Sequence, residues 1–207
     1  MNRIPFENNH FYHIYNRGVD KRSTFKNRGD MLRFIELLSA FNTNRSAPGG
    51  IRFTRRNQGS TLTNESLVVI HGFCLLENHF HILLEQKTEG GVSKFMQKVS
   101  TGYTMYFNKK YERSGALFQG RFKSKHVTSD GYLLRCLSYV VLNFKVHNNK
   151  KSGDHLYCSS HAENEVHSFI SKKIIKQNFK SDKDFLLFAN KQITDTKQLR
   201  SRLNLDL

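Results

Sequence analysis

The sequence predicts an α+β fold, with an antiparallel sheet and helices on one of its faces. Apolar residues form short runs or alternations of strand length in some segments and recur at helical spacing in others. These segments follow each other in the order strand, helix, strand, strand, helix, strand, helix, which is the order of a split βαβ, or ferredoxin-like, sheet. Pairing of the two middle strands as a hairpin makes the sheet antiparallel and leaves its second face available for a site.

The first half of the chain supplies three strands and one helix. Phe11 to Arg17 (FYHIYNR) is the first strand, and a helix follows from about Asp30. Leu67 to Leu76 is a continuous apolar run, typical of a central buried strand, and His79 to Glu85 (HFHILLE) runs back beside it. Residues 42–64 are polar and contain several arginines, so we interpret them as a basic loop or insertion able to grip a phosphate backbone.

The second half supplies two helices, one strand and a C-terminal extension. After Gly90-Gly91, apolar residues recur at helical spacing over four turns. A strand follows that places Arg121, Lys123 and Lys125 on one face, and a helix runs from about Ser129 to Asn143. We therefore expect a domain of residues 1–149 and a basic extension of residues 150–207 with one or two helices, at 169–179 and 182–191.

The charge indicates a polyanionic partner. The chain has 33 Lys and Arg against 17 Asp and Glu, a net charge of +16. The extension holds 11 of these basic and 7 of these acidic residues, only +4 of the total, so most of the excess belongs to the domain. Such an excess favours nucleic acid, because cationic side chains neutralise phosphates and release counterions.

The sequence favours a cytoplasmic protein without a membrane span. The first nine residues lack the apolar core of a signal peptide, and no apolar run approaches the ~18 residues that a span requires. Cys74, Cys136 and Cys158 are an odd number at wide spacings, which predicts neither a disulfide framework nor a zinc pattern and fits a reducing cytosol.

Two histidines form the first part of a candidate site. His79 and His81 lie two apart on a strand, so both imidazoles project from one face while Phe80 points into the core. Such a pair can bind a metal ion, although either ring can equally be a surface or base-stacking histidine. Together with an amide oxygen, such as that of an asparagine side chain, two imidazoles suit Mn²⁺ at least as well as Mg²⁺. Zinc is not excluded by ligand type.

A tyrosine on the helix at 129–143 forms the second part. At ~100° per residue Tyr139 lies roughly opposite the apolar stripe of this helix, and Asn143 lies one turn further on the same side. The alternative is an exposed tyrosine on a solvated face. Beside a metal-bound phosphodiester, a phenolate can attack phosphorus and form a covalent intermediate, which another strand's 3′-hydroxyl can resolve without a nucleotide cofactor.

The chain resembles the one-tyrosine HUH transposases, and most closely their REP-associated tyrosine transposase group. The matching stretches occur in the family's order and cover nearly all of residues 11–162: FYHIYNRG (11–18), ENHFHILLE (77–85), LFQGRFKS (117–124), YLLRCLSYVVLN (132–143) and CSSHA (158–162). The resemblance implies a ferredoxin-like or RRM-like fold, Mg²⁺ or Mn²⁺ bound by His79 and His81, and a 5′-phosphotyrosine at Tyr139. It also implies Asn143 as a third metal ligand, and it places the competing nucleophile, Tyr132, at the start of the helix.

The chain departs from the family pattern at two prolines. The family usually has proline after the helix asparagine, where this chain has Phe144 and the helix can run on. It also usually has proline ahead of the first histidine, where Glu77-Asn78 stands. Neither departure removes a reacting group.

The resemblance implies single-stranded DNA, often beside a small hairpin, as the substrate. Cationic side chains are expected to follow the backbone, while Tyr12 or Tyr15 stacks against bases. The expected DNA contacts are Arg17, Arg22, Gln119, Arg121, Lys123 and Lys125. The oligomeric state stays open between a monomer and a homodimer.

Two other functions remain as alternatives. One is a catalytically silent RRM-like protein that binds nucleic acid without chemistry. The other is a zinc hydrolase that uses water, which would need a carboxylate base near the histidines; Glu77 and Glu85 are the close candidates in sequence.

Overall fold

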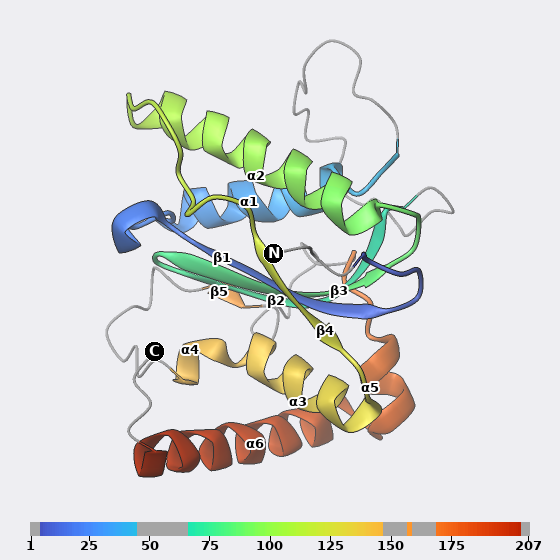
Figure 1. Cartoon of the computed structure of the whole chain (residues 1–207). Helices are drawn as coiled ribbons and strands as arrows, with labels where there is room; N and C mark the ends of the chain where they lie inside the picture. Colours follow the sequence, from blue (N-terminus) through green and yellow to red (C-terminus); the bar gives the residue numbers. More distant parts are fainter. Residues whose placement is uncertain (1–4, 45–65, 147–156, 159–168, 204–207) are drawn as a thin grey trace.

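The computed structural model of the chain describes residues 5–44, 66–146, 157–158 and 169–203, and its centre is an antiparallel sheet in the order β4-β1-β3-β2-β5 (Figure 1). The strands are β1 (Phe11–Arg17), β2 (Val68–Leu76), β3 (His79–Gln86), β4 (Lys123–Val127) and β5 (Tyr157–Cys158). The helices are α1 (Arg28–Ala40), α2 (Gly91–Lys110), α3 (Asp130–Val141), α4 (Asn143–Val146), α5 (Lys173–Asn178) and α6 (Asp182–Leu203), with a short 3₁₀ turn η1 (Val19–Lys21). The order β1-α1-β2-β3-α2-β4 confirms the predicted ferredoxin-like α+β fold.

The central hairpin sets the two faces of the sheet. β2 and β3 turn back on each other at Glu77 and Asn78, and β3 pairs on its other side with β1. Side chains alternate along β3, so Phe80 and Ile82 lie on one face, completely buried, while His79 and His81 lie on the other. The hairpin thereby fixes both histidines on the face opposite the main core.

Helices α1 and α2 cover the first face (Figure 1). Their core is rich in aromatic rings, and Phe34 of α1 packs against both Phe80 of β3 and Tyr103 of α2. The completely buried Asp30 joins the two helices, because its carboxylate accepts hydrogen bonds from Lys110 Nζ at 2.6 Å and from the Tyr111 hydroxyl at 2.7 Å. This layer is structural and supports the sheet from behind.

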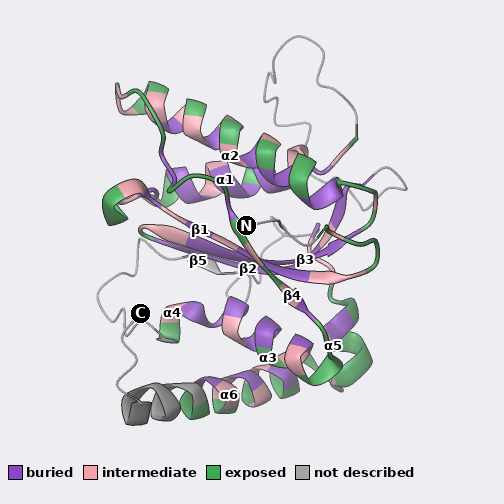
Figure 2. Cartoon of the chain, in the orientation of Figure 1, coloured by how far each residue is buried: buried purple, intermediate pink, exposed green. Residues whose placement is uncertain are grey.

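Helix α3 covers the second face. Its apolar residues pack on Leu83 and Val127 of the sheet on one side and on Phe185 of α6 on the other. Figure 2 shows α3 buried on the sides that face these neighbours, with α6 forming the outer layer. The face that the sequence left available is therefore covered by the helix that carries Tyr139, and the candidate site lies between them.

Two element boundaries differ from the sequence-based expectation. β4 begins at Lys123, so Arg121 lies in a bend before the strand and does not share its face with Lys125. Gly120 precedes the bend with a φ of +69°, a conformation that side-chain-bearing residues rarely adopt. Helix α3 ends at Val141, because Leu142 leaves helical geometry (φ −114°, ψ 18°), and Asn143 begins the separate α4.

The expectation that the cysteines form no disulfide is wrong for Cys74, which is disulfide-bonded. Cys158 of β5 lies directly opposite Cys74 in the register of β2 and β5. Spacing along the sequence does not report this proximity, because the sheet brings together residues that are far apart in the chain. Cys136 of α3 is a buried free thiol whose pKa burial raises to about 12.

Some expectations fall outside the described residues. The basic loop 42–64 is described only up to residue 44, and the expected domain boundary at residue 149 lies in a segment that the structure does not describe. Within the described part of the chain, no helix has the length and apolar character needed to cross a membrane.

Candidate active site between the sheet and α3

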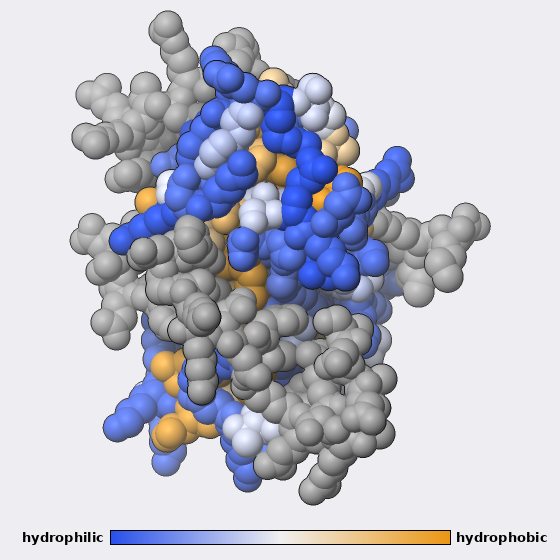
Figure 3. All heavy atoms as spheres, turned by 90° about the vertical axis from the view of Figure 1, so that its left-hand side faces the viewer, coloured by the Kyte–Doolittle hydropathy of each residue, from blue (hydrophilic) through white to orange (hydrophobic). Residues whose placement is uncertain are grey.

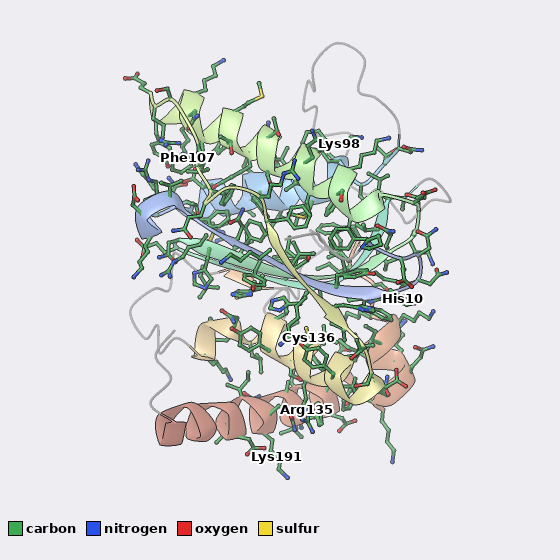
Figure 4. The ribbon with its side chains drawn as sticks, viewed as in Figure 1. His10, Lys98, Phe107, Arg135, Cys136 and Lys191 are labelled. Atoms are coloured by element: carbon green, nitrogen blue, oxygen red, sulfur yellow. The ribbon has the colours of Figure 1, made fainter. Side chains whose placement is uncertain are left out.

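A cavity of about 960 Å³ lies between the second face of the sheet and α3. Strands β1, β3 and β4, the β2–β3 turn and α3 supply most of its lining, which includes most of the sequence-predicted site residues. Figure 4 shows side chains filling the space between the sheet and α3, with Cys136 on the side of α3 that faces the sheet. Its lining includes His13, Tyr15, Arg17, His79, His81 and Tyr139.

The two predicted metal-binding histidines lie side by side in this cavity. The ring centroids of His79 and His81 are 5.2 Å apart, and their planes are nearly perpendicular at 86°. His79 Nδ1 lies 2.6 Å from Asn78 Oδ1, and His81 Nδ1 lies 2.8 Å from His13 Nε2. Each imidazole is therefore held in place through its Nδ1 atom.

His13 is a member of the site that the sequence analysis missed. It lies on β1, 92 % buried, and its ring stacks on that of His81 with centroids 5.0 Å apart. Burial, together with the charge of Lys125, lowers the pKa of His13 to about 4, so its ring is neutral at pH 7. Strand alternation was the signal available, because His13 shares a face with Tyr15 and Arg17.

The structure brings Tyr139 against the histidines. Its ring centroid lies 5.5 Å from that of His81 and 5.8 Å from that of His13, in edge-on arrangements of 86° and 74°. Tyr132 also lines the cavity, but its described ring contact is with the ammonium group of Lys125, at 5.5 Å. Of the two candidate nucleophiles, Tyr139 is therefore the one whose ring packs on His81 and His13.

Asn143 does not reach the cavity lining. It is completely buried, and neither atom of its side-chain amide has a hydrogen-bond partner within the described part of the chain. The expected i,i+4 relation to Tyr139 assumed one continuous helix, but Leu142 breaks the helix between the two residues. A buried amide without a partner is costly, so Asn143 is a polar group suited to accept a ligand.

The imidazoles of His79 and His81 are the donor groups that the cavity offers to a divalent cation, while the amide of Asn143 lies outside its lining. Within the described residues, no three His, Cys, Asp or Glu side chains form a group that could hold a metal ion. Two imidazoles suit Mn²⁺ at least as well as Mg²⁺, which prefers oxygen ligands.

Four of the six predicted DNA contacts line the cavity: Arg17, Gln119, Lys123 and Lys125. Arg22 is exposed elsewhere, where its guanidinium bonds the Val19 carbonyl and lies 3.4 Å from the carboxylate of Asp20. Arg121 lies in the bend before β4 and is also absent from the lining. Arg135 of α3, one turn before Tyr139, adds a cation that the list of expected contacts omitted.

The two aromatic residues proposed for base stacking have different positions. Tyr15 lines the cavity and stacks on His81, with ring centroids 5.8 Å apart and planes at 22°. Tyr12 is 96 % buried on the opposite face of β1, where its hydroxyl accepts a hydrogen bond from the backbone of Glu7. Strand alternation separates the two rings, so the expectation that Tyr12 is exposed is wrong.

The two carboxylates nearest the histidines in sequence both have side-chain partners, and only Glu77 lines the cavity. Glu85 lies 3.3 Å from His71 Nε2 and 3.2 Å from Lys87 Nζ, outside the cavity lining. The hydrogen bond from His71, with Lys87 adding to it, lowers the pKa of Glu85 to about 2, so this carboxylate is a poor proton acceptor. Glu77 lines the cavity and accepts a short hydrogen bond from the Ser23 hydroxyl.

The side of the molecule that carries η1 and the β2–β3 turn is largely hydrophilic in its upper part (Figure 3). The described residues there include the exposed Lys21, Arg22 and Glu77. This side borders the His79 end of the cavity, because Glu77 and Asn78 contribute to the lining. A polar ligand can therefore approach the site along a polar surface.

The comparison with protein families agrees with the resemblance seen in the sequence. Residues 54–143 match the sequence model of a family described as IS200-like transposases. Among solved structures, the chain is similar to a REP-associated tyrosine transposase bound to a REP hairpin, with a TM-score of 0.47 and 14% identity over 72% of this chain and 74% of that chain. Comparison with curated proteins gives no match. The matched segment contains His79, His81 and Tyr139, whereas β1 and His13 precede it.

Proposed function

We propose that the chain is a transposase of the IS200-like family, whose model matches residues 54–143, and that it cleaves and rejoins single-stranded DNA with Tyr139 as the nucleophile. The observation that carries the proposal is the packing of the Tyr139 ring on His81, 5.5 Å between centroids, in a cavity lined by cations. A silent nucleic-acid-binding protein needs no such tyrosine beside paired histidines.

The reaction exchanges one phosphodiester for another. Tyr139 Oη attacks the scissile phosphorus, the bond from phosphorus to the 3′-oxygen breaks, and the phenolic proton is lost to solvent while the released 3′-oxygen is protonated. The product is a 5′-phosphotyrosine and a free 3′-hydroxyl. A 3′-hydroxyl from another strand then attacks the phosphotyrosine and restores Tyr139, so joining consumes no nucleotide.

His79 and His81 are the residues that hold a divalent cation in this proposal, with Mg²⁺ or Mn²⁺ as candidates and Asn143 as a third ligand after local rearrangement. The cation supplies charge stabilisation at the scissile phosphate. Asn143 needs such a rearrangement because it lies one residue beyond the helix break, outside the cavity lining.

The cations around the cavity hold the DNA strand. Lys123 and Lys125 project from β4 toward the site, and Arg135 lies on α3 opposite them. Single-stranded nucleic acid binds such grooves through its phosphates, while exposed rings stack on its bases. Tyr15 is the stacking residue, and a hairpin beside the cleaved strand is the expected form of the substrate.

A zinc hydrolase is disfavoured by the position of Glu85. Activation of water requires a carboxylate free to take a proton beside the metal. Glu85 is instead bound to His71 and Lys87, and it lies away from the cavity. Glu77 lines the cavity, but its carboxylate accepts a hydrogen bond from the Ser23 hydroxyl.

The test is cleavage of single-stranded oligonucleotides with Mg²⁺ or Mn²⁺, followed by denaturing gels that detect a protein–DNA adduct. The wild type and Tyr132→Phe are expected to form the adduct, and Tyr139→Phe is expected to form none. If the wild type binds these oligonucleotides in the presence of either metal but never forms an adduct, the protein is instead a catalytically silent nucleic-acid-binding protein.

A further inference from the structure

We propose that Asn78 and His13 are positioning residues that hold His79 and His81 as Nδ1–H tautomers, so that both rings present an Nε2 lone pair to a cation. The inference rests on the proposed function, since it assigns these two histidines as metal ligands. It adds which neighbouring residues determine the nitrogen atom of each ring that binds the metal. A neutral imidazole binds metal only through the nitrogen that lacks the proton.

The bond between Asn78 and His79 has one possible direction. The Asn78 Nδ2 atom donates to the Lys21 carbonyl at 3.1 Å, which orients the amide so that Oδ1 faces His79. Oδ1 is an acceptor, so the His79 Nδ1 atom 2.6 Å away must carry the hydrogen. His79 is therefore an Nδ1–H tautomer with its lone pair on Nε2.

The turn that carries Asn78 is held rigidly. The Glu77 carbonyl accepts from the backbone N–H groups of Thr24 and Phe25 at 2.8 and 2.9 Å, and the Asn78 carbonyl accepts from Gly18 at 2.8 Å. These bonds fix the turn to the segment after β1. Asn78 thus supplies an acceptor side chain at a fixed position beside His79.

The bond between His13 and His81 completes the pair. Their 2.8 Å contact requires one nitrogen to donate and the other to accept. Both rings are 92 % buried, so water has little access to either partner. If His81 binds a cation through Nε2, its Nδ1 is the donor and His13 Nε2 is the acceptor. Partners of this kind orient the ligand ring and raise its basicity.

The same arrangement at both rings indicates that both are held in the same tautomer. Each histidine is engaged at Nδ1, one by an amide oxygen from the turn and the other by an imidazole from β1. His13 lies 68 residues before His81 in the sequence and outside the segment that matches the family model. Strand pairing alone brings it to the metal-binding pair.

The experiment uses long-range ¹H–¹⁵N spectra of the metal-free, full-length protein at about pH 8, where an ordinary histidine is neutral. Wild-type His79 and His81 are expected as Nδ1–H tautomers. Asn78→Ala and His13→Phe remove the acceptors. Asn78→Ala is expected to abolish the preference of His79 for the Nδ1–H tautomer, and His13→Phe that of His81. Asn78→Asp and His13→Gln keep an acceptor oxygen and are the matched controls, expected to retain it.

Titration with Mn²⁺, without DNA, gives a second readout on the same proteins. Asn78→Ala and His13→Phe are expected to weaken Mn²⁺ binding by about 10- to 100-fold, and the acceptor-retaining variants by less. Asn78 lies in a surface turn, so its variants test the idea even if His13→Phe does not fold.

Two results would overturn the proposal: an Nε2–H tautomer for either histidine in the wild type, or unchanged tautomers and Mn²⁺ affinity in the acceptor-free variants. Because neither measurement involves DNA cleavage, failure here is distinguishable from failure of the Tyr139 mechanism.

Discussion

The ring of Tyr139 on α3 lies 5.5 Å from the ring of His81 on β3, with the two planes at 86°. This contact joins two elements that are far apart in the sequence, and it forms because α3 packs on the face of the sheet opposite α1 and α2. The proposed nucleophile and the two proposed metal ligands thereby line one cavity.

Removal of either imidazole should abolish cleavage. We expect His79→Ala or His81→Ala to slow DNA cleavage in Mn²⁺ at least about 100-fold, because several kcal/mol of charge stabilisation at the phosphate is lost. His126→Ala is the matched control, since His126 lies on the other face of β4, stacked on Tyr12 and His10. Equal losses in all three variants would contradict the assignment.

The cavity cations should matter more than the exposed arginines. Lys123→Ala combined with Lys125→Ala should weaken binding of single-stranded DNA and reduce the slope of log K against log salt by about 0.7 per lost phosphate contact. Arg22→Ala and Arg121→Ala should have smaller effects, because neither residue lines the cavity. Binding measured by fluorescence anisotropy at several salt concentrations decides between them, and a larger effect of the exposed arginines would place the DNA elsewhere.

Acid should destabilise the fold through Glu85. Its pKa is about 2 in the folded protein against an ordinary 4.5, chiefly because of the hydrogen bond from His71. The stabilisation is therefore complete above about pH 4.5 and lost as the pH falls through 2, and it is on the order of 2 kcal/mol. The free energy of unfolding, measured with urea between these pH values, should depend less steeply on pH in Glu85→Gln than in the wild type. Glu36→Gln, in an exposed pair on α1, should retain the wild-type dependence.

The C-terminal extension should stabilise the tyrosine helix. Phe185 of α6 is 97 % buried in the cluster that includes Leu137 and Val140 of α3. Phe185→Ala should lower the free energy of unfolding by about 3 kcal/mol, because it leaves a cavity behind α3. Leu187→Ala is the control from the same helix, with its side chain 63% exposed and an expected effect under about 0.5 kcal/mol. Similar unfolding energies for the two variants would show that α6 contributes little to holding α3.

Local periodicity was sufficient to predict the fold and the placement of three candidate site residues. Alternation along β3 places His79 and His81 on one face, and the phase of α3 turns Tyr139 away from its apolar stripe; the structure has both. The order of strands and helices in turn predicts the antiparallel sheet. These features depend on residues that are close together in the chain.

Features that depend on distant residues were not predictable in this way. The bond between His13 and His81 and the opposition of Cys74 and Cys158 exist only once the strands are in register. The position of Asn143 was extrapolated along an ideal helix, and the break at Leu142 invalidates that extrapolation. No proline or glycine marks the break in the sequence.

The most direct test of the central claim locates the covalent bond to DNA. Trypsin separates the two candidate tyrosines, because cleavage after Lys125, Arg135 and Lys145 gives one peptide with Tyr132 and another, Cys136–Lys145, with Tyr139. Mass spectrometry of the digested protein–DNA adduct is expected to find the 5′-phosphonucleotide on Cys136–Lys145, at Tyr139. Its attachment to the peptide with Tyr132, or to any other residue, would contradict the proposed mechanism.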